Sequence, residues 1–279
     1  MSKIVGLALP VVLVLLFVVS LASGITLLAP VNAEADNAPV YIGRVGPGQT
    51  VELQFSRDTG SVAAINPTTG NNALWDKANV VKSTLPEGWE GKDSLKYETP
   101  LTVFVSVSPS AEEKNYTFEV GFIDEYEGTE SKVAKFTVSV DNDVFDAGLE
   151  QETVVAGVGQ PAVFALRVKS TSSASETFRI NATGLPVDWK LSKTFFLPAK
   201  EEKVVYFEVV GNIQKEVPFE IIVSSISSDK ITKTNDARIV TVSTLLQDAK
   251  ATSHGLPLFP SVEQHVYSLI GLVANLLWK

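Results

Sequence analysis

The residues whose types and spacing could do chemistry form one acidic cluster. Asp141, Asp143 and Asp146 lie close together in a short stretch between two strand-rich parts of the chain. Carboxylates and carbonyl oxygens are the ligands that calcium takes in proteins, so the cluster is a candidate calcium site that would stiffen this junction. Its spacing matches no EF-hand loop, and an acidic linker without a metal explains the same residues.

Other catalytic chemistry has little support in the sequence. The chain has no cysteine and 2 histidines, His254 and His265, which both lie beyond the strand-rich parts. A zinc site or a thiol nucleophile is therefore excluded. Carboxylate pairs such as Glu112-Glu113 and Glu201-Glu202 stand in expected loops, where a solvated turn is the ordinary explanation. We expect no enzymatic activity and no cofactor.

The charge of the chain argues against nucleic acid as a partner. The formal net charge is −9, and residues 34–149 hold 19 acidic and 9 basic residues. Such a surface repels phosphate backbones. Two glycosylation sequons begin at Asn115 and Asn181, and both asparagines are candidate attachment sites, although chance alone would produce about two in this composition.

Apolar and polar residues alternate with period two through most of the chain, which is typical of antiparallel strands with one buried face. The buried phase in the first half is Val51, Leu53, Phe55; Val103, Val105, Val107; Phe118, Val120, Phe122; and Phe136, Val138, Val140. Seven strands are predicted in the second half: residues 152–156, 162–168, 177–182, 189–191, 203–210, 218–224 and 237–242.

One segment occurs twice. Leu85-Pro86-Glu87-Gly88-Trp89 recurs 100 residues later as Leu185-Pro186-Val187-Asp188-Trp189, and a Gly-Gln turn precedes each copy at Gly48-Gln49 and Gly159-Gln160. A repeat of this length is a whole domain rather than a solenoid unit. The sequence therefore predicts two related domains, residues 36–143 and 144–244.

These motifs, together with Phe118-Glu119-Val120 and Phe219-Glu220-Ile221, resemble the immunoglobulin-like modules often attached to prokaryotic glycosidases and archaeal surface proteins. The resemblance implies an all-β chain of two tandem immunoglobulin-like β-sandwiches. It also implies an alternative function as a carbohydrate-binding accessory module, although no catalytic domain accompanies the two repeats.

Three tryptophans could be structural or could bind a ligand. Trp89 and Trp189 occupy equivalent positions in the two repeats, which favours buried corner residues over platforms for sugar stacking. Trp75 has no counterpart in the second repeat and stands in an insertion rich in Asn, Thr and Gly. It is a candidate exposed binding aromatic, with a place in a small additional core as the other interpretation.

The N-terminus predicts export. Ile4 to Ala29 is an uncharged stretch of 26 residues, which as a helix would span about 39 Å and could cross a bilayer. Ala33-Glu34-Ala35 offers a signal-peptidase pattern, so residues 1–35 are a cleaved signal peptide or a retained signal anchor. Lys3 before the apolar run places the following residues outside the membrane.

The C-terminal part, residues 245–279, predicts a connector and a short amphipathic helix. Ser261 and Gln264 form a capping box, and the run from Val266 to Trp278 is 13 residues, or about 20 Å as a helix, too short to span a bilayer. We expect this helix to meet a membrane surface or a partner, or to pack on its own sandwich. Its apolar face is Val262, Val266, Leu269, Ile270, Val273, Leu276 and Leu277.

Together these features predict a non-enzymatic, membrane-associated structural or interaction protein of a prokaryotic, archaeal-type cell envelope. The absence of cysteine from an exported chain favours such an envelope over an animal secretory route. The expected location is the extracellular side of the cytoplasmic membrane. Expected partners are the membrane and other envelope proteins or glycans, and the sequence does not determine the oligomeric state.

Overall fold

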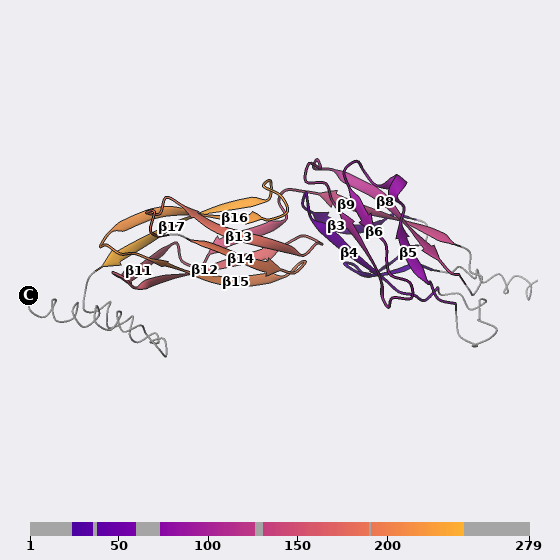
Figure 1. The fold of residues 1–279 in the computed structure, drawn as a ribbon, viewed down its shortest axis with the longest axis horizontal. Helices are drawn as coiled ribbons and strands as arrows, with labels where there is room; N and C mark the ends of the chain where they lie inside the picture. Colours follow the sequence, from indigo (N-terminus) through magenta and orange to yellow (C-terminus); the bar gives the residue numbers. More distant parts are fainter. Residues whose placement is uncertain (1–23, 36–37, 60–72, 126–130, 190, 243–279) are drawn as a thin grey trace, which may run out of the picture. The chain divides into compact units, whose positions relative to one another are not determined.

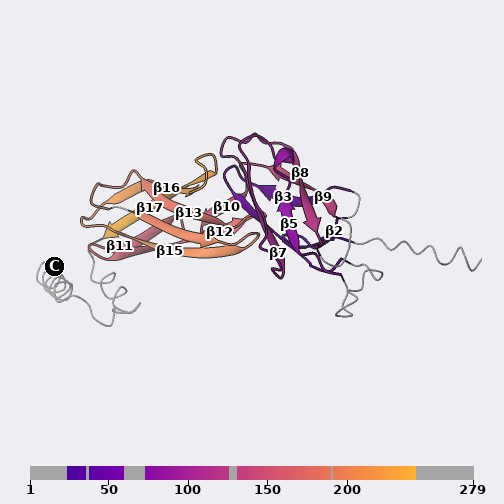
Figure 2. The same cartoon turned by 45° about the vertical axis from the view of Figure 1, so that its right-hand side comes forward.

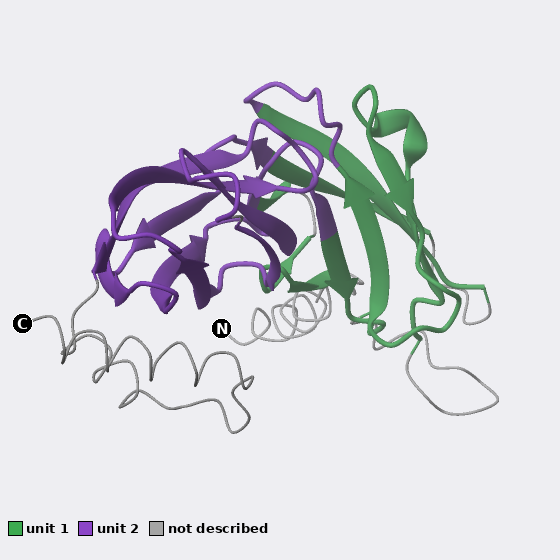
Figure 3. Ribbon diagram, turned by 60° about the vertical axis from the view of Figure 1, so that its left-hand side comes forward, with its two compact units in different colours: residues 1–42, 52–106, 115–138 green, residues 43–51, 107–114, 139–279 purple. Residues whose placement is uncertain are grey.

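The computed structural model describes residues 24–35, 38–59, 73–125, 131–189 and 191–242. Its contacts divide the chain into two compact units, shown in Figure 3. Unit 1 comprises residues 1–42, 52–106 and 115–138, and unit 2 comprises residues 43–51, 107–114 and 139–279. The sequence-based division at residues 143 and 144 is thus not the division by contacts, because three segments of the first repeat, residues 43–51, 107–114 and 139–143, belong to unit 2.

The first repeat forms two sheets of alternating strands. One sheet has the order β2 (Ala33–Glu34), β1 (Thr26–Ala29), β4 (Thr50–Phe55), β7 (Leu101–Ser106) and β6 (Glu90–Lys92). The other has the order β3 (Val40–Val45), β9 (Lys132–Val140), β8 (Asn115–Ile123) and β5 (Lys77–Val80). A 3-10 turn, η1, covers Lys82–Thr84.

Aromatic rings from both sheets meet in the core of unit 1. The Phe55 ring of β4 lies 4.9 Å from the Phe122 ring of β8 and 5.4 Å from the Phe136 ring of β9. All three side chains are fully buried. The period-two alternation explains this packing, because it turns every second residue of each strand toward the opposite sheet.

Unit 2 also contains two sheets, visible in Figures 1 and 2. The smaller sheet has the order β10 (Phe145–Leu149), β12 (Pro161–Ser170) and β15 (Glu202–Val210). The larger has the order β11 (Thr153–Gly157), β17 (Thr232–Val242), β16 (Glu216–Ser225), β13 (Glu176–Thr183) and β14 (Ser192–Leu197). β11 pairs with β17 in parallel, whereas β16 pairs with β17 and with β13 antiparallel.

The core of unit 2 lies between these two sheets. The Phe164 ring of β12 meets the Phe219 ring of β16 edge to face at 5.5 Å, and the Phe145 ring of β10 lies 4.6 Å from the Phe178 ring of β13. Buried aliphatic residues such as Leu166 and Ile221 fill the space around them. The prediction of an all-β fold is confirmed for the residues that the structure describes.

Most predicted strands are present, and one is misplaced. The buried phases predicted around Val51, Val103, Phe118 and Phe136 are all buried. The strand predicted at Trp189–Leu191 is wrong, because Trp189 ends a turn and the strand begins at Ser192. β10 and β5 lack a long alternating pattern and were not expected from periodicity.

The N-terminal prediction requires a correction. Residues 24–35 are part of the folded unit rather than of a signal or anchor segment, because β1 pairs with β4 through Leu27 and Phe55 and with β2 through Thr26 and Glu34. Ile25 and Leu27 are buried, and the Ala35 amide donates to the Ile25 carbonyl at 2.8 Å. A cut after Ala35 would therefore remove two strands from the sheet.

The two copies of the Leu-Pro-x-x-Trp segment close through the same backbone hydrogen bond, although Gly88 has a φ of 75° and Asp188 at the equivalent position does not have a positive φ. The Trp89 amide donates to the Pro86 carbonyl at 3.1 Å, and the Trp189 amide donates to the Pro186 carbonyl at 2.8 Å. Both indole rings are buried, with 7% and 4% exposed surface. The expectation that these two tryptophans are core residues is confirmed.

The expected helices lie outside the described residues, at positions 1–23 and 243–279. Within the part of the chain that the structure describes, no helix has the length and apolar character needed to cross a membrane.

Candidate functional site

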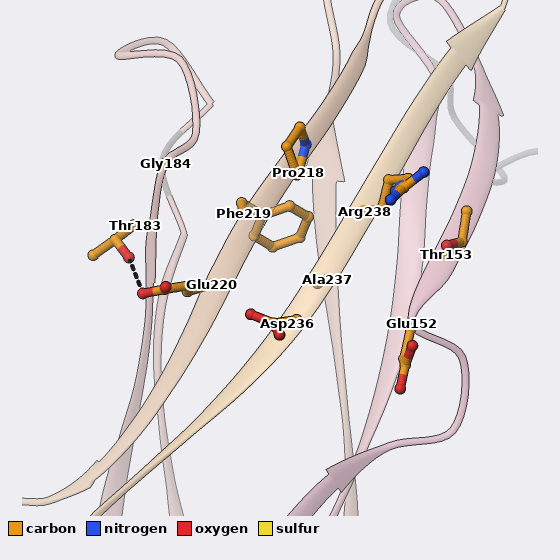
Figure 4. A pocket seen from close by; sticks show the side chains of 10 residues that line it. All are labelled: Glu152, Thr153, Thr183, Gly184, Pro218, Phe219, Glu220, Asp236, Ala237 and Arg238. Atoms are coloured by element: carbon orange, nitrogen blue, oxygen red, sulfur yellow. Dashed lines mark hydrogen bonds between the residues drawn. The ribbon is translucent and has the colours of Figure 1, made fainter.

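A shallow depression of about 600 Å³ lies on the larger sheet of unit 2, and Figure 4 shows its lining. Strand pairing explains why its polar residues gather, because Glu220 on β16 stands opposite Thr183 on β13 on one side and Asp236 on β17 on the other. The lining residues are Glu152, Thr153, Thr183, Gly184, Pro218, Phe219, Glu220, Asp236, Ala237 and Arg238.

The depression is acidic. Glu152, Glu220 and Asp236 contribute carboxylates, and the Arg238 guanidinium is already bound to Glu216 at 2.6 Å. Like charges directly opposite each other on neighbouring strands, as at Glu220 and Asp236, destabilise a sheet. Donors such as sugar hydroxyls or amines would relieve this repulsion.

No exposed ring among its lining residues could stack on a sugar. Phe219 is the aromatic residue of the lining, and its side chain is 4% exposed because the ring packs in the core. The described residues also contain no group of three or more acidic or imidazole side chains placed to hold a metal ion. The depression therefore presents carboxylate oxygens, one of which accepts a hydrogen bond from the Thr183 hydroxyl at 3.3 Å, and no exposed ring.

The calcium prediction for Asp141, Asp143 and Asp146 is not supported, because basic side chains occupy this cluster. Arg44 Nη1 lies 3.3 Å from Asp141 Oδ2, and Lys233 Nζ lies 2.6 Å from Asp143 Oδ1. Asp141 Oδ1 also accepts a hydrogen bond from the Asp143 amide at 2.8 Å. Arg44 and Lys233 of the same chain thus neutralise the carboxylates of Asp141 and Asp143.

Electrostatics at this cluster follow from the same pairing. The hydrogen bond from Lys233, together with its charge, lowers the pKa of Asp143 below the ordinary value of 3.8. Reciprocally, the hydrogen bond to Asp143 raises the pKa of Lys233 above its ordinary value of 10.5, and the charges of Asp146 and Asp141 act in the same direction. Lys233 thus supplies a positive charge to the aspartate cluster.

Trp75 is not a surface aromatic. Its side chain is fully buried, and its ring lies 5.9 Å from that of Phe122. Arg57 fixes this region, since its Nε donates to the Trp75 carbonyl at 2.8 Å and its Nη2 lies 3.2 Å from Asp76 Oδ1. The prediction of an exposed binding aromatic at Trp75 is wrong, and the ring packs on Phe122 of the main core rather than in a small additional core.

An exposed aromatic residue lies close to this network at Tyr97. The Tyr97 side chain is 46% exposed, and the guanidinium carbon of Arg57 lies 5.7 Å from its ring centroid. The backbone at Tyr97 has a φ of 62°, an uncommon conformation for an aromatic residue. A tyrosine in a polar loop is common in sequences, so no pattern marked this position.

The remaining predicted sites fall on strands or outside the described residues. Asn115 is exposed at the first position of β8, and Asn181 is half-buried on the outward phase of β13. The apolar face predicted for the C-terminal helix, Val262 to Leu277, lies outside the described residues.

Comparisons with known proteins give structural similarity alone. No protein-family model matches the chain, and no curated protein matches its sequence. A chimeric titin Z1Z2 carrying an exogenous KLER peptide from decorin is similar at 9% identity, with a TM-score of 0.37 over 79% of this chain and 98% of that chain. The β-glucosidase from Listeria innocua in complex with glucose is similar at 15% identity, with a TM-score of 0.25 over 34% of this chain and 16% of that chain.

Proposed function

We propose that this chain is a non-enzymatic structural or interaction protein of a prokaryotic, archaeal-type cell envelope. Two tandem immunoglobulin-like domains are displayed on the extracellular side of the cytoplasmic membrane. The observation that carries the proposal is where the folded unit begins. The first strand, β1, begins at Thr26, and the described residues begin at Gly24; the uncharged stretch before Gly24, Ile4 to Ser23, has 20 residues. A helix of that length measures about 30 Å, the thickness of a bilayer core.

Two further features support this proposal. The chain has no cysteine, which suits an exported protein whose folding does not depend on oxidation. Both units bury aromatic cores between paired sheets. Loops carried by such a rigid scaffold are common sites of partner binding.

Labelling on intact cells tests the topology. Single cysteines at Leu95 and Ile226, which are 71% and 52% exposed, give unique reactive sites in a cysteine-free chain. A membrane-impermeant maleimide should label both on intact cells, and the protein should sediment with membranes. The matched control lacks residues 4–23 and should be labelled after lysis alone. Labelling of the full chain that also requires lysis would contradict the proposal.

A carbohydrate-binding accessory module is the second candidate, and the acidic depression of unit 2 favours it. If this function is correct, a glycan array should reveal a ligand whose binding is lost in Asp236→Ala. Glu208→Ala is the matched control, since Glu208 is an exposed carboxylate on the other sheet of the same unit, outside the depression. Failure of the unaltered chain to bind any glycan rejects this candidate.

A further inference from the structure

One end of unit 2, which we call the exit pole, is the end at which β17 reaches Val242 and the chain continues. Three turns form it: residues 157–160, 184–189 and 211–215. The Gly159 amide donates to the Gly211 carbonyl at 2.8 Å, and the Val158 amide donates to the Val242 carbonyl at 3.2 Å. In Figure 1 this is the end marked by the β11 label, opposite the connection between β16 and β17.

Apolar side chains stand at the exposed tips of these turns. Val187 is 81% exposed, which is the largest value among the exposed large hydrophobic residues of the described chain. Ile213 is 56% exposed, and Val210, the last residue of β15 before the third turn, is 40% exposed. Apolar residues gathered at one end of a domain mark a contact surface more strongly than single ones scattered over it.

The underlying core holds these tips in place. A Cβ added at Gly211 would lie 2.7 Å from Trp189 Cη2 and 2.3 Å from Thr241 Cγ2, so the second and third turns and β17 are closely packed. The Thr241 hydroxyl donates to the Ile213 carbonyl, and the Thr241 amide donates to the Lys215 carbonyl at 3.0 Å. Val187 and Ile213 are therefore presented by a supported surface.

We propose that the exit pole is a membrane-contact surface, with Val187, Val210 and Ile213 entering the interfacial region of a lipid bilayer. This inference rests on the proposed function, which places the chain at a membrane. The occupant follows from where the chain leads. After Val242 come 37 residues, including the run from Val266 to Trp278, whose apolar stripe is typical of an interfacial helix. The chain leaves unit 2 at the exit pole, so a bilayer that binds this stripe is within reach of Val187, Val210 and Ile213.

The absence of cysteine allows a direct measurement. Val187→Cys and Ile213→Cys in the full chain are each labelled with an environment-sensitive fluorophore and reconstituted into phosphatidylcholine and phosphatidylglycerol vesicles. Ile226→Cys is the matched control, because Ile226 is 52% exposed, belongs to the same unit and follows β16, whereas Ile213 precedes it. Leu269→Cys reports on the C-terminal segment separately.

Probes at Val187 and Ile213 should shift to shorter wavelength on reconstitution and lose intensity with nitroxide-labelled lipids, while the probe at Ile226 responds to aqueous iodide. Equal responses at Ile213 and Ile226 would overturn the inference. Shielding from iodide without lipid quenching would also overturn it, because the chain's own C-terminal segment or a second copy would then cover the pole. If lipid quenches the probe at Leu269 but not the probes at Val187 and Ile213, the exit pole does not contact the bilayer, although the chain is still associated with a membrane. If lipid quenches none of these probes, both the membrane contact of the exit pole and the proposed membrane association of the chain are contradicted.

Discussion

Trp89 and Trp189 show how a tryptophan at one position of the repeat both ends a turn and fills the core of its domain. Each follows a proline by three residues, donates its amide back to that proline's carbonyl and buries its indole. The Trp89 ring lies 5.0 Å from Tyr116 and 6.5 Å from Phe118, so its removal would open a cavity against β8. A cavity of this size is among the most costly single changes in a core.

Trp89→Ala and Trp189→Ala should therefore each lower the free energy of unfolding by about 3–5 kcal/mol, measured by urea denaturation. Val187→Ala is the control, because Val187 is 81% exposed on the same turn as Trp189. It should change stability by less than about 0.5 kcal/mol. Unfolding of Trp189→Ala at the same urea concentration as the unaltered chain would contradict the core assignment.

The pairing of Asp143 with Lys233 makes a pH-dependent contribution to stability. Folding lowers the pKa of Asp143, so the contribution is complete above the ordinary value of 3.8 and is lost as pH falls through the lowered pKa. Folding raises the pKa of Lys233, so the contribution is complete below 10.5 and is lost as pH rises through the raised value.

Lys233→Met should accordingly destabilise the chain between about pH 4 and pH 10, by about 0.2–1 kcal/mol because both side chains are partly exposed. The difference from the unaltered chain should shrink at pH 2 to 3 in thermal melts. A difference that is constant down to pH 2 would show that packing rather than charge is responsible. Lys82→Met is a suitable control, since Lys82 is an exposed lysine in η1, away from the aspartate cluster.

At the scale of elements, β1 shows why composition alone misplaces a boundary. Thr26–Ala29 continues an apolar run that reads as a membrane segment, yet Leu27 is fully buried beside Phe55. A chain beginning at Gly24 should therefore retain the stability of the folded unit. A chain beginning at Asp36 should have a free energy of unfolding lower by about 2–5 kcal/mol or more, because the loss of one large buried aliphatic side chain alone costs about that much. Equal melting temperatures of the two truncated chains would refute the role of β1.

One edge of each sheet in unit 2 carries a lysine that bonds to the other sheet. β14 and β15 are the edge strands concerned, and β11 and β10 form the opposite edges. Lys193 on β14 donates to the Tyr206 carbonyl of β15 at 2.5 Å, and Lys203 on β15 donates to the Phe196 carbonyl of β14 at 3.2 Å. Lysines at open edges oppose pairing with another chain.

Replacing Lys193 and Lys203 together by threonine should expose these edges and promote self-association, detectable by light scattering at raised concentration. Lys169→Thr is the matched control, because Lys169 is an exposed lysine on the central strand β12, whose edges are already paired. Equal scattering by the two proteins would show that the lysines do not protect the edges.

At the scale of the whole molecule, the boundary of the first sequence repeat differs from the boundary of the compact unit defined by contacts. The turn that contains Gly46 belongs to the first repeat by sequence and to unit 2 by contacts. A Cβ at Gly46 would lie 2.3 Å from Ile231 Cδ1 and 3.2 Å from Val144 Cγ2, and both of these residues are buried. Glycine at this position permits a close approach, and any Cβ here would require the buried Ile231 side chain to shift.

Gly46→Ala should therefore lower the free energy of unfolding by about 1–3 kcal/mol through overpacking. Gly148→Ala is the matched control, since a Cβ there meets nothing within 4 Å. It should be neutral or stabilise by up to about 1 kcal/mol, because alanine restricts the unfolded chain. Calorimetry of both variants checks this, and indistinguishable melting of the two would exclude close packing at Gly46.

Local pattern in the sequence determined the all-β class, the repeat and the two tryptophan corners. Alternation of period two turns Val51, Leu53 and Phe55 inward whatever else the chain does. The repeated Pro-x-x-Trp turn closes through one backbone hydrogen bond within a few residues. These features depend on neighbours in the chain, so the chain's own order is enough to predict them.

Only the tertiary structure decided which partners meet across long sequence separations. Apolar composition cannot distinguish a bilayer from a sheet core, and the pairing of Leu27 with Phe55 makes Thr26–Ala29 a strand. An aspartate cluster attracts any cation, and Lys233, 90 residues beyond Asp143, supplies the one that binds it. The acidic depression arises in the same way, because strand register sets Glu220 opposite Asp236. Contacts of this kind are set by how sheets pair and pack, a property of the whole fold that local pattern does not contain.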